Sequence, residues 1–420
     1  MSQLKLPPYA ITTRASQSLY PCQLNAGLKS RTVAVGIDVL SGGNRFCYDP
    51  WDLYNERPRV ISSPCAAIFG KVGKGKSSLV KTYSGRQLLF GTWVGVMDPK
   101  GEYDNWARYF GVTTIRPRPG GTVCINPLDA GPLGLTDPEE LRVRRIEMIC
   151  ALAASRMLVE PDAEDANAIG FALEEITQKT TNPTLGDIVR LLLHPTVWMA
   201  DKLATTVTAL AAKVRPTAQA LNRLVTGDLA GMFDGQTNIN IDWDGPGIVV
   251  DLSAVHGTPA CAPVMICVGA WLAQAVTRTD GRHRMLILDE LWAILHLVSV
   301  TRWLRGLEKL SRKYGIALWY VLHRLSDLAG SSSAGSEARE QAEGLLKDVE
   351  TLVLYPQDPS EATALVSMLG LRESVAHLVT QRLPDHRALW LVGKKAAVVH
   401  HVMTRSEFSY SQTDDAMKVA

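Results

Sequence analysis

The sequence lacks the features that direct a chain out of the cell or across a membrane. The N-terminus, MSQLKLPPYA, has none of the basic, apolar and small-residue order of a signal peptide, and the longest largely apolar run, 263–276, is too short to span a bilayer. The seven cysteines are scattered and include no C-x-x-C pair of the zinc-binding or redox kind. We expect a cytoplasmic chain with reduced thiols, which protein partners could hold at the inner face of the cell membrane.

The sequence also has little net charge and few aromatic residues. Over 420 residues the formal charge is +2, while charged residues make up 20% and apolar residues 46%, as in an ordinary soluble enzyme. No basic patch with interleaved aromatic residues indicates a single-stranded nucleic-acid ligand. DNA stays open as a partner, because a basic groove can exist locally in a chain that is neutral overall.

The predicted elements divide the chain into five parts. Residues 1–60 form a strap with short strands near 32–39 and 45–48, and residues 61–136 begin an α/β core. Residues 137–232 have helical periodicity and hardly any strand signal, which predicts an inserted all-α subdomain. The core resumes over 233–406, and 407–420 is predicted to be a flexible tail. Alternating strands and helices predict an α/β fold with a mainly parallel sheet.

Residues 70–77, GKVGKGKS, fit the P-loop (Walker A) pattern G-x-x-x-x-G-K-[ST] between an apolar strand and a helix. A chance glycine-rich turn is the alternative, and the strand and helix on either side disfavour it. The glycines would let backbone amides approach phosphates, Lys76 would reach the β- and γ-phosphates, and Ser77 would bind Mg²⁺. The predicted nucleotide-binding residues are Gly70, Lys71, Val72, Gly73, Lys74, Gly75, Lys76, Ser77 and Ser78.

A second motif, MLILDE at 285–290, is an apolar strand that ends in two carboxylates, the Walker B pattern. Asp289 would hold the Mg²⁺ shell, and Glu290 would act as the general base for the attacking water. Alone, such a pair is equally typical of a helix N-terminus, where the dipole favours acidic residues. Together with the P-loop it predicts Mg²⁺-dependent hydrolysis of ATP, and Glu290 favours hydrolysis over nucleotide binding alone.

Two polar residues flank the next predicted strand, 316–322. His323 follows the strand and is a candidate sensor of the γ-phosphate; a histidine bonded to neighbouring backbone is the alternative. Arg312 precedes the strand on the basic face of its helix, and such faces are usually solvated. In the segment DPKGEY, Asp98, Lys100 and Glu102 could supply ligands or only stabilise a turn from strand to helix.

Eight motifs follow one another in order: GKVGKGKSS, VMDPKGEY (96–103), INPLD (125–129), GDLAGMFDG (227–235), VVDLSA (249–254), LILDELWAIL (286–295), SRKYG (311–315) and HRLSDL (323–328). The set resembles the FtsK/HerA superfamily of P-loop ATPases over about residues 36–404. Within that superfamily it is most similar to conjugative-transfer and type IV secretion ATPases of the VirB-type, TraC/TraG-like branch.

The resemblance implies a RecA-like core, homo-hexamers with ATP at the subunit interfaces, and partners in secretion or conjugation machinery. It also implies a catalytic arginine supplied in trans, for which Arg312 is the first candidate and Arg305 the second. Two features differ from the branch. Many relatives have glutamine where this chain has His323, and full-length relatives carry a large N-terminal domain where only a short strap precedes the P-loop here.

Three functions are therefore open from the sequence. The first is an ATP-hydrolysing motor that energises conjugative transfer or type IV secretion, through assembly or substrate transport. The second is a DNA-pumping translocase or coupling protein of the FtsK type. The third is an assembly scaffold controlled by nucleotide, which Glu290 disfavours because a pure switch has no strong need for a general base.

Overall fold

The computed structural model describes residues 28, 30, 32–130, 137–276, 280–291, 295, 298–324 and 337–412. Outside these lie the first part of the predicted strap (1–27), the end of the predicted tail (413–420) and parts of two motifs, at 292–294 and 325–328. In chain order the strands are β1 (Ala34–Asp38), β2 (Asn44–Cys47), β3 (Ala66–Phe69), β4 (Trp93–Asp98), β5 (Thr113–Ile115), β6 (Gly247–Asp251), β7 (Arg284–Leu288), β8 (Ile316–Leu322), β9 (Thr351–Leu354), β10 (Arg387–Val392) and β11 (Lys395–His401).

These strands form one sheet with the order β2-β1-β11-β10-β9-β3-β8-β7-β4-β6-β5. All neighbours from β9 to β5 are parallel. Antiparallel pairs join the remaining strands, from β9 through β10, β11 and β1 to β2. The parallel strands β3, β4, β6, β7 and β8 are short runs with every residue buried, such as AAIF in β3, because helices cover both faces. The prediction of an α/β fold with a mainly parallel sheet is confirmed.

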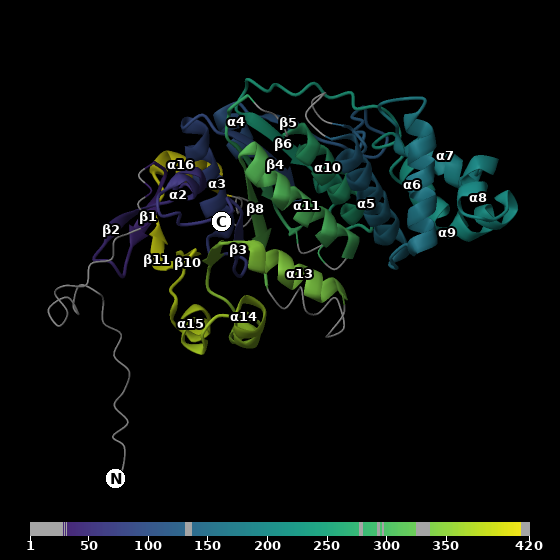
Figure 1. The fold of residues 1–420 in the computed structure, drawn as a ribbon. Helices are drawn as coiled ribbons and strands as arrows, with labels where there is room; N and C mark the ends of the chain where they lie inside the picture. Colours follow the sequence, from purple (N-terminus) through teal and green to yellow (C-terminus); the bar gives the residue numbers. More distant parts are fainter. Residues whose placement is uncertain are drawn as a thin grey trace, which may run out of the picture.

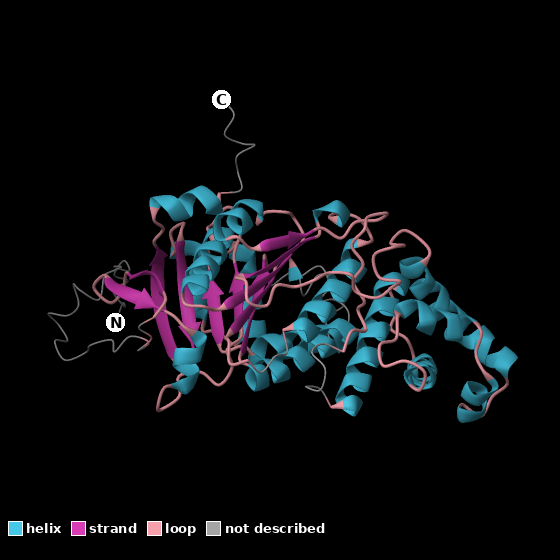
Figure 2. Ribbon diagram, turned by 90° about the horizontal axis from the view of Figure 1, so that it is seen from above, coloured by secondary structure: helices cyan, strands magenta, loops and turns pink. Residues whose placement is uncertain are grey.

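Helices lie on both sides of the sheet (Figure 2). Around the strands they are α2 (Pro50–Asn55), α3 (Lys76–Leu89), α4 (Asp104–Phe110), α10 (Cys261–Ala275), α11 (Val298–Tyr314), α13 (Glu337–Asp348), α14 (Ala362–Leu369), α15 (Glu373–His377) and α16 (Arg405–Ser411), with short turns η1 (Ser253–Val255), η3 (Pro359–Glu361) and η4 (Leu378–Arg382). In the described part of the chain, none of the helices combines the length and the apolar character that crossing a bilayer requires.

Alternate residues of the central parallel strands pack into two separate cores. In β7, Met285 and Ile287 belong to the cluster that includes Tyr83 of α3. Leu286 and Leu288 belong to the other cluster, which contains residues of α10 and α11. This alternation follows from the two-residue period of a strand and holds the P-loop helix α3 on one face of the sheet.

Between β5 and β6 the chain forms the helices α5 (Pro138–Met157), α6 (Ala163–Thr177), α7 (Leu185–Leu193), α8 (Val197–Lys202) and α9 (Val207–Val225). Polar caps start them: Asp137 accepts from the first turn of α5, and Thr184 forms a capping box with Asp187 in α7. Helix α5 packs against α10 and α11, while α6 to α9 extend away from the sheet (Figure 1). The described residues of this segment form helices and no strand, as predicted for an inserted all-α subdomain.

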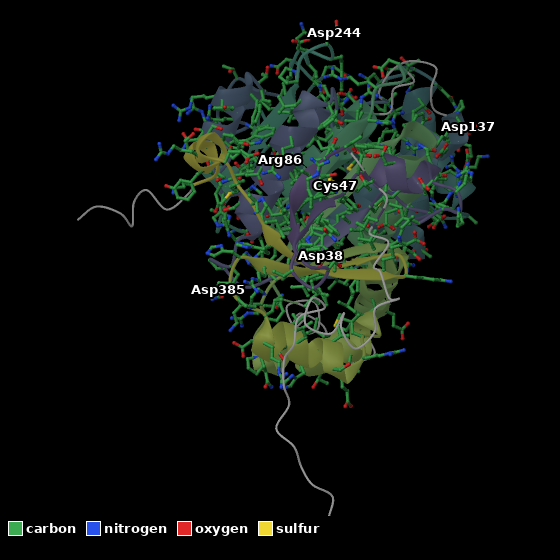
Figure 3. All side chains as sticks on the ribbon, turned by 90° about the vertical axis from the view of Figure 1, so that its left-hand side faces the viewer. Asp38, Cys47, Arg86, Asp137, Asp244 and Asp385 are labelled. Atoms are coloured by element: carbon green, nitrogen blue, oxygen red, sulfur yellow. The ribbon has the colours of Figure 1, made fainter. Side chains whose placement is uncertain are left out.

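The two short strands predicted within the strap are present, whereas the C-terminal end of the described chain differs from the predicted tail. Residues 34–47 are part of the sheet as β1 and β2. At the other end, residues 405–411 form α16 where a flexible tail was predicted from 407, and α16 packs on α3 and α4. The helix is held because Glu407 pairs with Arg86, which Figure 3 labels, and because Tyr410 is buried against Tyr109 and Phe110. The sequence T-x-x-E at 404–407 forms a capping box and was the available signal.

Candidate nucleotide site

Four neighbouring parallel strands, in the spatial order β3, β8, β7 and β4, end at one edge of the sheet. The chain continues from them into the P-loop, into His323, into the pair Asp289 and Glu290, and into the segment DPKGEY. Ligands of open α/β sheets bind at the carboxyl ends of the strands. Four motifs that are far apart in the sequence therefore meet at this edge.

The P-loop has the backbone shape that a phosphate cradle requires. Gly73 and Gly75 have φ angles of +77° and +107°, which side chains rarely allow. Gly70 is needed for a different reason, since a Cβ at this position would clash with the side chain of Tyr355. Val72 projects from the loop and is 78% exposed. Helix α3 then begins at Lys76, so its N-terminal amides face the loop.

The ammonium group of Lys76 is folded back onto its own loop. It donates to the carbonyl oxygen of Gly70 and to that of Lys71, the latter at 3.2 Å. Burial lowers the pKa of Lys76 to about 8, although the charges of Asp289 and Glu290 work in the opposite direction. A buried ammonium whose partners are mainly neutral carbonyls fits a site that receives an anion.

Glu290 lies at the centre of the site. Its Oε1 accepts a hydrogen bond from His323 Nε2 at 2.7 Å and pairs with Lys100 Nζ at 2.5 Å. His323 Nδ1 lies 3.2 Å from Lys76 Nζ. The partners assign a neutral imidazole with its proton on Nε2, because Nδ1 faces an ammonium donor and Nε2 faces a carboxylate. The φ of Glu290 is +54°, a conformation that is costly for a residue with a side chain and occurs at functional sites.

The environment of Asp289 suits a carboxylate that binds a magnesium ion. Asp289 is 8% exposed, and burial, reinforced by the charges of Glu290 and Asp98, raises its pKa to about 7. A cation beside it would restore the carboxylate, which is the reverse of the effect of burial. Among the described residues no three His, Cys, Asp or Glu side chains gather as a metal site. Mg²⁺ suits the site nevertheless, because it binds one or two protein oxygens and otherwise phosphate and water.

Solved structures have a similar fold. VirB4 of Thermoanaerobacter pseudethanolicus superposes with a TM-score of 0.72 at 20% identity, over 92% of this chain and 100% of that chain. The chain has the fold of VirB4. The plasmid coupling protein TrwB superposes with TM-scores of 0.63 in complex with the non-hydrolysable ATP analogue ADPNP and 0.62 in complex with ADP and Mg²⁺. These two matches have 16% and 15% identity and cover 94% and 96% of this chain and 93% and 97% of TrwB. The sequence matches no family model, and no curated protein matches it.

Within this VirB4-like fold, the segment DPKGEY has two roles that its sequence left undecided. Asp98 holds the turn after β4, because its carboxylate accepts from the backbone amides of Lys100, Gly101 and Tyr103 at 2.9 to 3.2 Å. Lys100 enters the site and contacts Glu290. The sequence indicates no partner for Lys100; its position directly after a strand is the only local signal.

Two further P-loop lysines are tied to the C-terminal half of the VirB4-like core. Lys71 pairs with Asp358 at 2.7 Å, and Lys74 pairs with Asp385 at 2.8 Å. Asp358 follows β9 and Asp385 precedes β10, so both ion pairs depend on the order of strands in the sheet. Nothing in the local sequence of these carboxylates indicated them.

The two candidate arginines are in different environments. Arg312 is exposed and precedes β8, whereas His323 follows it. The seven residues of β8 extend over about 23 Å. Arg312 therefore lies near the amino ends of the parallel strands, whereas Glu290 of the same chain lies at their carboxyl ends. Arg305 packs inside its own chain, since a Cβ on Gly344 of α13 would overlap its guanidinium group. This packing disfavours Arg305, the second candidate, as an arginine that reaches a neighbour.

Proposed function

We propose that this protein is a Mg²⁺-dependent ATPase, and that it works as a motor which energises conjugative transfer or type IV secretion. The observation that carries the proposal is the position of Glu290. Its carboxylate follows β7, directly after Asp289, and connects through His323 to the P-loop Lys76. A general base, a phosphate-binding lysine and a magnesium ligand are the parts that phosphoryl transfer to water requires.

Each residue of the site has its own role in the reaction. Lys76 exchanges the carbonyls of Gly70 and Lys71 for the β- and γ-phosphates of ATP. Asp289 and Ser77 would hold Mg²⁺, which when bound would supply positive charge beside the phosphate oxygens. Glu290 takes the proton of the attacking water, and His323 orients the Glu290 carboxylate through the bond to Oε1.

The placement of Arg312 supports a homo-oligomer, and we infer a hexamer with ATP between subunits. The side chain is exposed and lies at the opposite edge of the sheet from Glu290 of its own chain. An arginine in that position cannot reach the site of its own chain, so a catalytic role for Arg312 requires a neighbouring copy. In trans it would stabilise the charge that develops during transfer, a contribution of about 1,000-fold or more to the rate.

The likeness to TrwB favours one alternative, a coupling protein or translocase that moves DNA. A nucleotide-controlled scaffold is disfavoured, because the general base Glu290 is in contact with the rest of the site. For the motor we propose partners among secretion or conjugation proteins, and a cytoplasmic location at the inner face of the cell membrane.

The test is ATP hydrolysis with Mg²⁺ as a function of protein concentration, with oligomer mass followed in parallel. We expect turnover to rise with assembly. Glu290→Gln should bind ATP and lose about 100- to 10,000-fold in turnover, and Arg312→Ala should lose comparably. Lys313→Ala is the matched control, because Lys313 is the exposed neighbour of Arg312 on the same helix and should stay active.

Two outcomes would contradict the proposal. Turnover by Glu290→Gln equal to that of the parent would show that Glu290 is not the general base. A turnover rate that does not depend on protein concentration would show that the site does not lie at a subunit interface. DNA separates the two motors: stimulation by DNA that weakens with salt would favour the translocase, because phosphate contacts release counterions.

A further inference from the structure

Lys100 is a cation in the candidate site to which the hydrolytic scheme gives no role. Its Nζ lies 2.5 Å from Glu290 Oε1 and 3.5 Å from His323 Nε2. The backbone of Lys100 is fixed, since its amide donates to Asp98 Oδ1. The side chain is 32% exposed, against 7% for that of Glu290. Lys100 therefore has a fixed backbone and a flexible four-carbon side chain that opens toward solvent.

The four charged or polar side chains form a line that follows the order of the strands. Lys76 after β3, His323 after β8, Glu290 after β7 and Lys100 after β4 contact one another in that spatial order. A lysine thus stands at each end of the line, and the carboxylate lies between His323 and Lys100. Lys76 is the P-loop lysine, and Lys100 lies on the far side of the general base from it.

Two donors converge on one oxygen of the general base. His323 and Lys100 both address Oε1, and the ammonium of Lys100 neutralises the carboxylate. A base that is neutralised by a lysine is a poor acceptor for the proton of water. The terminal phosphate of ATP carries more negative charge than one carboxylate, so it competes for the same ammonium.

We propose that Lys100 binds the γ-phosphate of ATP and, when no γ-phosphate is present, holds the carboxylate of the general base Glu290 in an ion pair. Arrival of ATP transfers the Lys100 ammonium from Glu290 Oε1 to a γ-phosphate oxygen. Glu290 is then released for the attacking water only when a substrate is present. The inference rests on the proposed ATPase function and adds to it a residue that distinguishes ATP from ADP.

The alternative is that Lys100 acts only through Glu290, as a permanent counterion. The two roles separate in a Glu290→Gln background, where Lys100 has no carboxylate to neutralise and hydrolysis no longer consumes the ligand. In that background a direct phosphate contact still contributes to ATP binding. A role that operates through the carboxylate does not.

The experiment is titration of Mg²⁺-ATP and of Mg²⁺-ADP into Glu290→Gln and into Glu290→Gln/Lys100→Ala, by calorimetry. We expect removal of the Lys100 ammonium to raise the Kd for ATP by about tenfold or more, the effect of losing one charge-assisted hydrogen bond, with the Kd for ADP changed less than about twofold. Lys100→Arg in the same background should retain the preference for ATP, and Lys100→Gln should lose it.

The results of this titration distinguish a failure of the Lys100 inference from a failure of the proposed ATPase function. Equal Kd values for ATP with Lys100 and with alanine would overturn the inference and leave the ATPase intact. Parallel loss of ATP and ADP binding would also overturn it, because Lys100 would then serve the site as a whole. Rapid hydrolysis by Glu290→Gln itself would instead refute the assignment of the general base. Circular dichroism of Lys100→Gln and Lys100→Ala checks that both variants are folded.

Discussion

Replacing Arg86 with alanine would remove the contact that joins the P-loop helix α3 to the C-terminal helix α16. The guanidinium group donates to both oxygens of Glu407, at 2.6 and 2.8 Å. It also donates to the carbonyl oxygens of Ala34 in β1 and of Val402 after β11, each at 2.6 Å. The Arg86 side chain thus links its own helix α3 to α16, to β1 and to the residues after β11.

The expected loss follows from burial. The side chains of Arg86 and Glu407 are 17% and 11% exposed. Breaking a buried ion pair by removing one partner costs about 3–5 kcal/mol, and the remaining exposure lowers our expectation for Arg86→Ala to about 3 kcal/mol. Burial opposes the ionisation of Glu407, but the bonds from Arg86 and from the Thr404 amide outweigh it and hold the pKa of Glu407 below its usual value. The contribution is therefore present above the usual pKa of glutamate and is lost as the pH falls through the lower folded value.

The assay is urea unfolding at pH 7 of the parent, Arg86→Ala, Glu407→Gln and the double variant. We expect the double variant to lose less than the sum of the single losses, because both single changes break the same pair. Arg190→Ala is the control: its partner is Asp187 and its side chain is 72% exposed, so the loss should be below about 1 kcal/mol. A loss for Arg86→Ala as small as for Arg190→Ala would refute the reasoning.

Three further changes test other parts of the structure. His323→Gln should keep most ATP turnover, because an amide can donate to the general base as the imidazole does, whereas His323→Ala should lose at least about tenfold in steady-state assays. Burial raises the pKa of Glu308 to about 8, so the parent should lose stability as the pH rises toward and through 8. Glu308→Gln should abolish that loss, of the order of 3 kcal/mol, in urea unfolding at pH 5 and pH 9; an unchanged pH profile would contradict this. Gly75→Ala should abolish nucleotide binding in calorimetry, because φ is +107° and the Cβ would lie 3.2 Å from the ring of Tyr355. Gly91→Ala, with φ of +84° and open space around it, is its control for backbone strain and should still bind nucleotide.

The parts of the candidate site that could be predicted are those carried by local sequence. A glycine-rich loop between a strand and a helix predicts a phosphate cradle, and Gly73 and Gly75 have the positive φ angles that such a loop requires. Asp289 and Glu290 were found because an apolar run ended in two carboxylates. The role of Lys100 could not be predicted, because nothing near it in the sequence indicates the Glu290 carboxylate, which follows the neighbouring strand of the sheet.

Local sequence patterns were enough to predict most of the helices and strands and the loop that can bind phosphate, because periodicity and glycine placement act over a few residues. Tertiary structure alone decided the order of the strands, and with it the line from Lys76 through His323 and Glu290 to Lys100. It also decided that α16 packs on α3 through Arg86, where a free tail was predicted. Ion pairs and shared hydrogen bonds depend on which segments become neighbours, and neither hydrophobic period nor local motif specifies that arrangement.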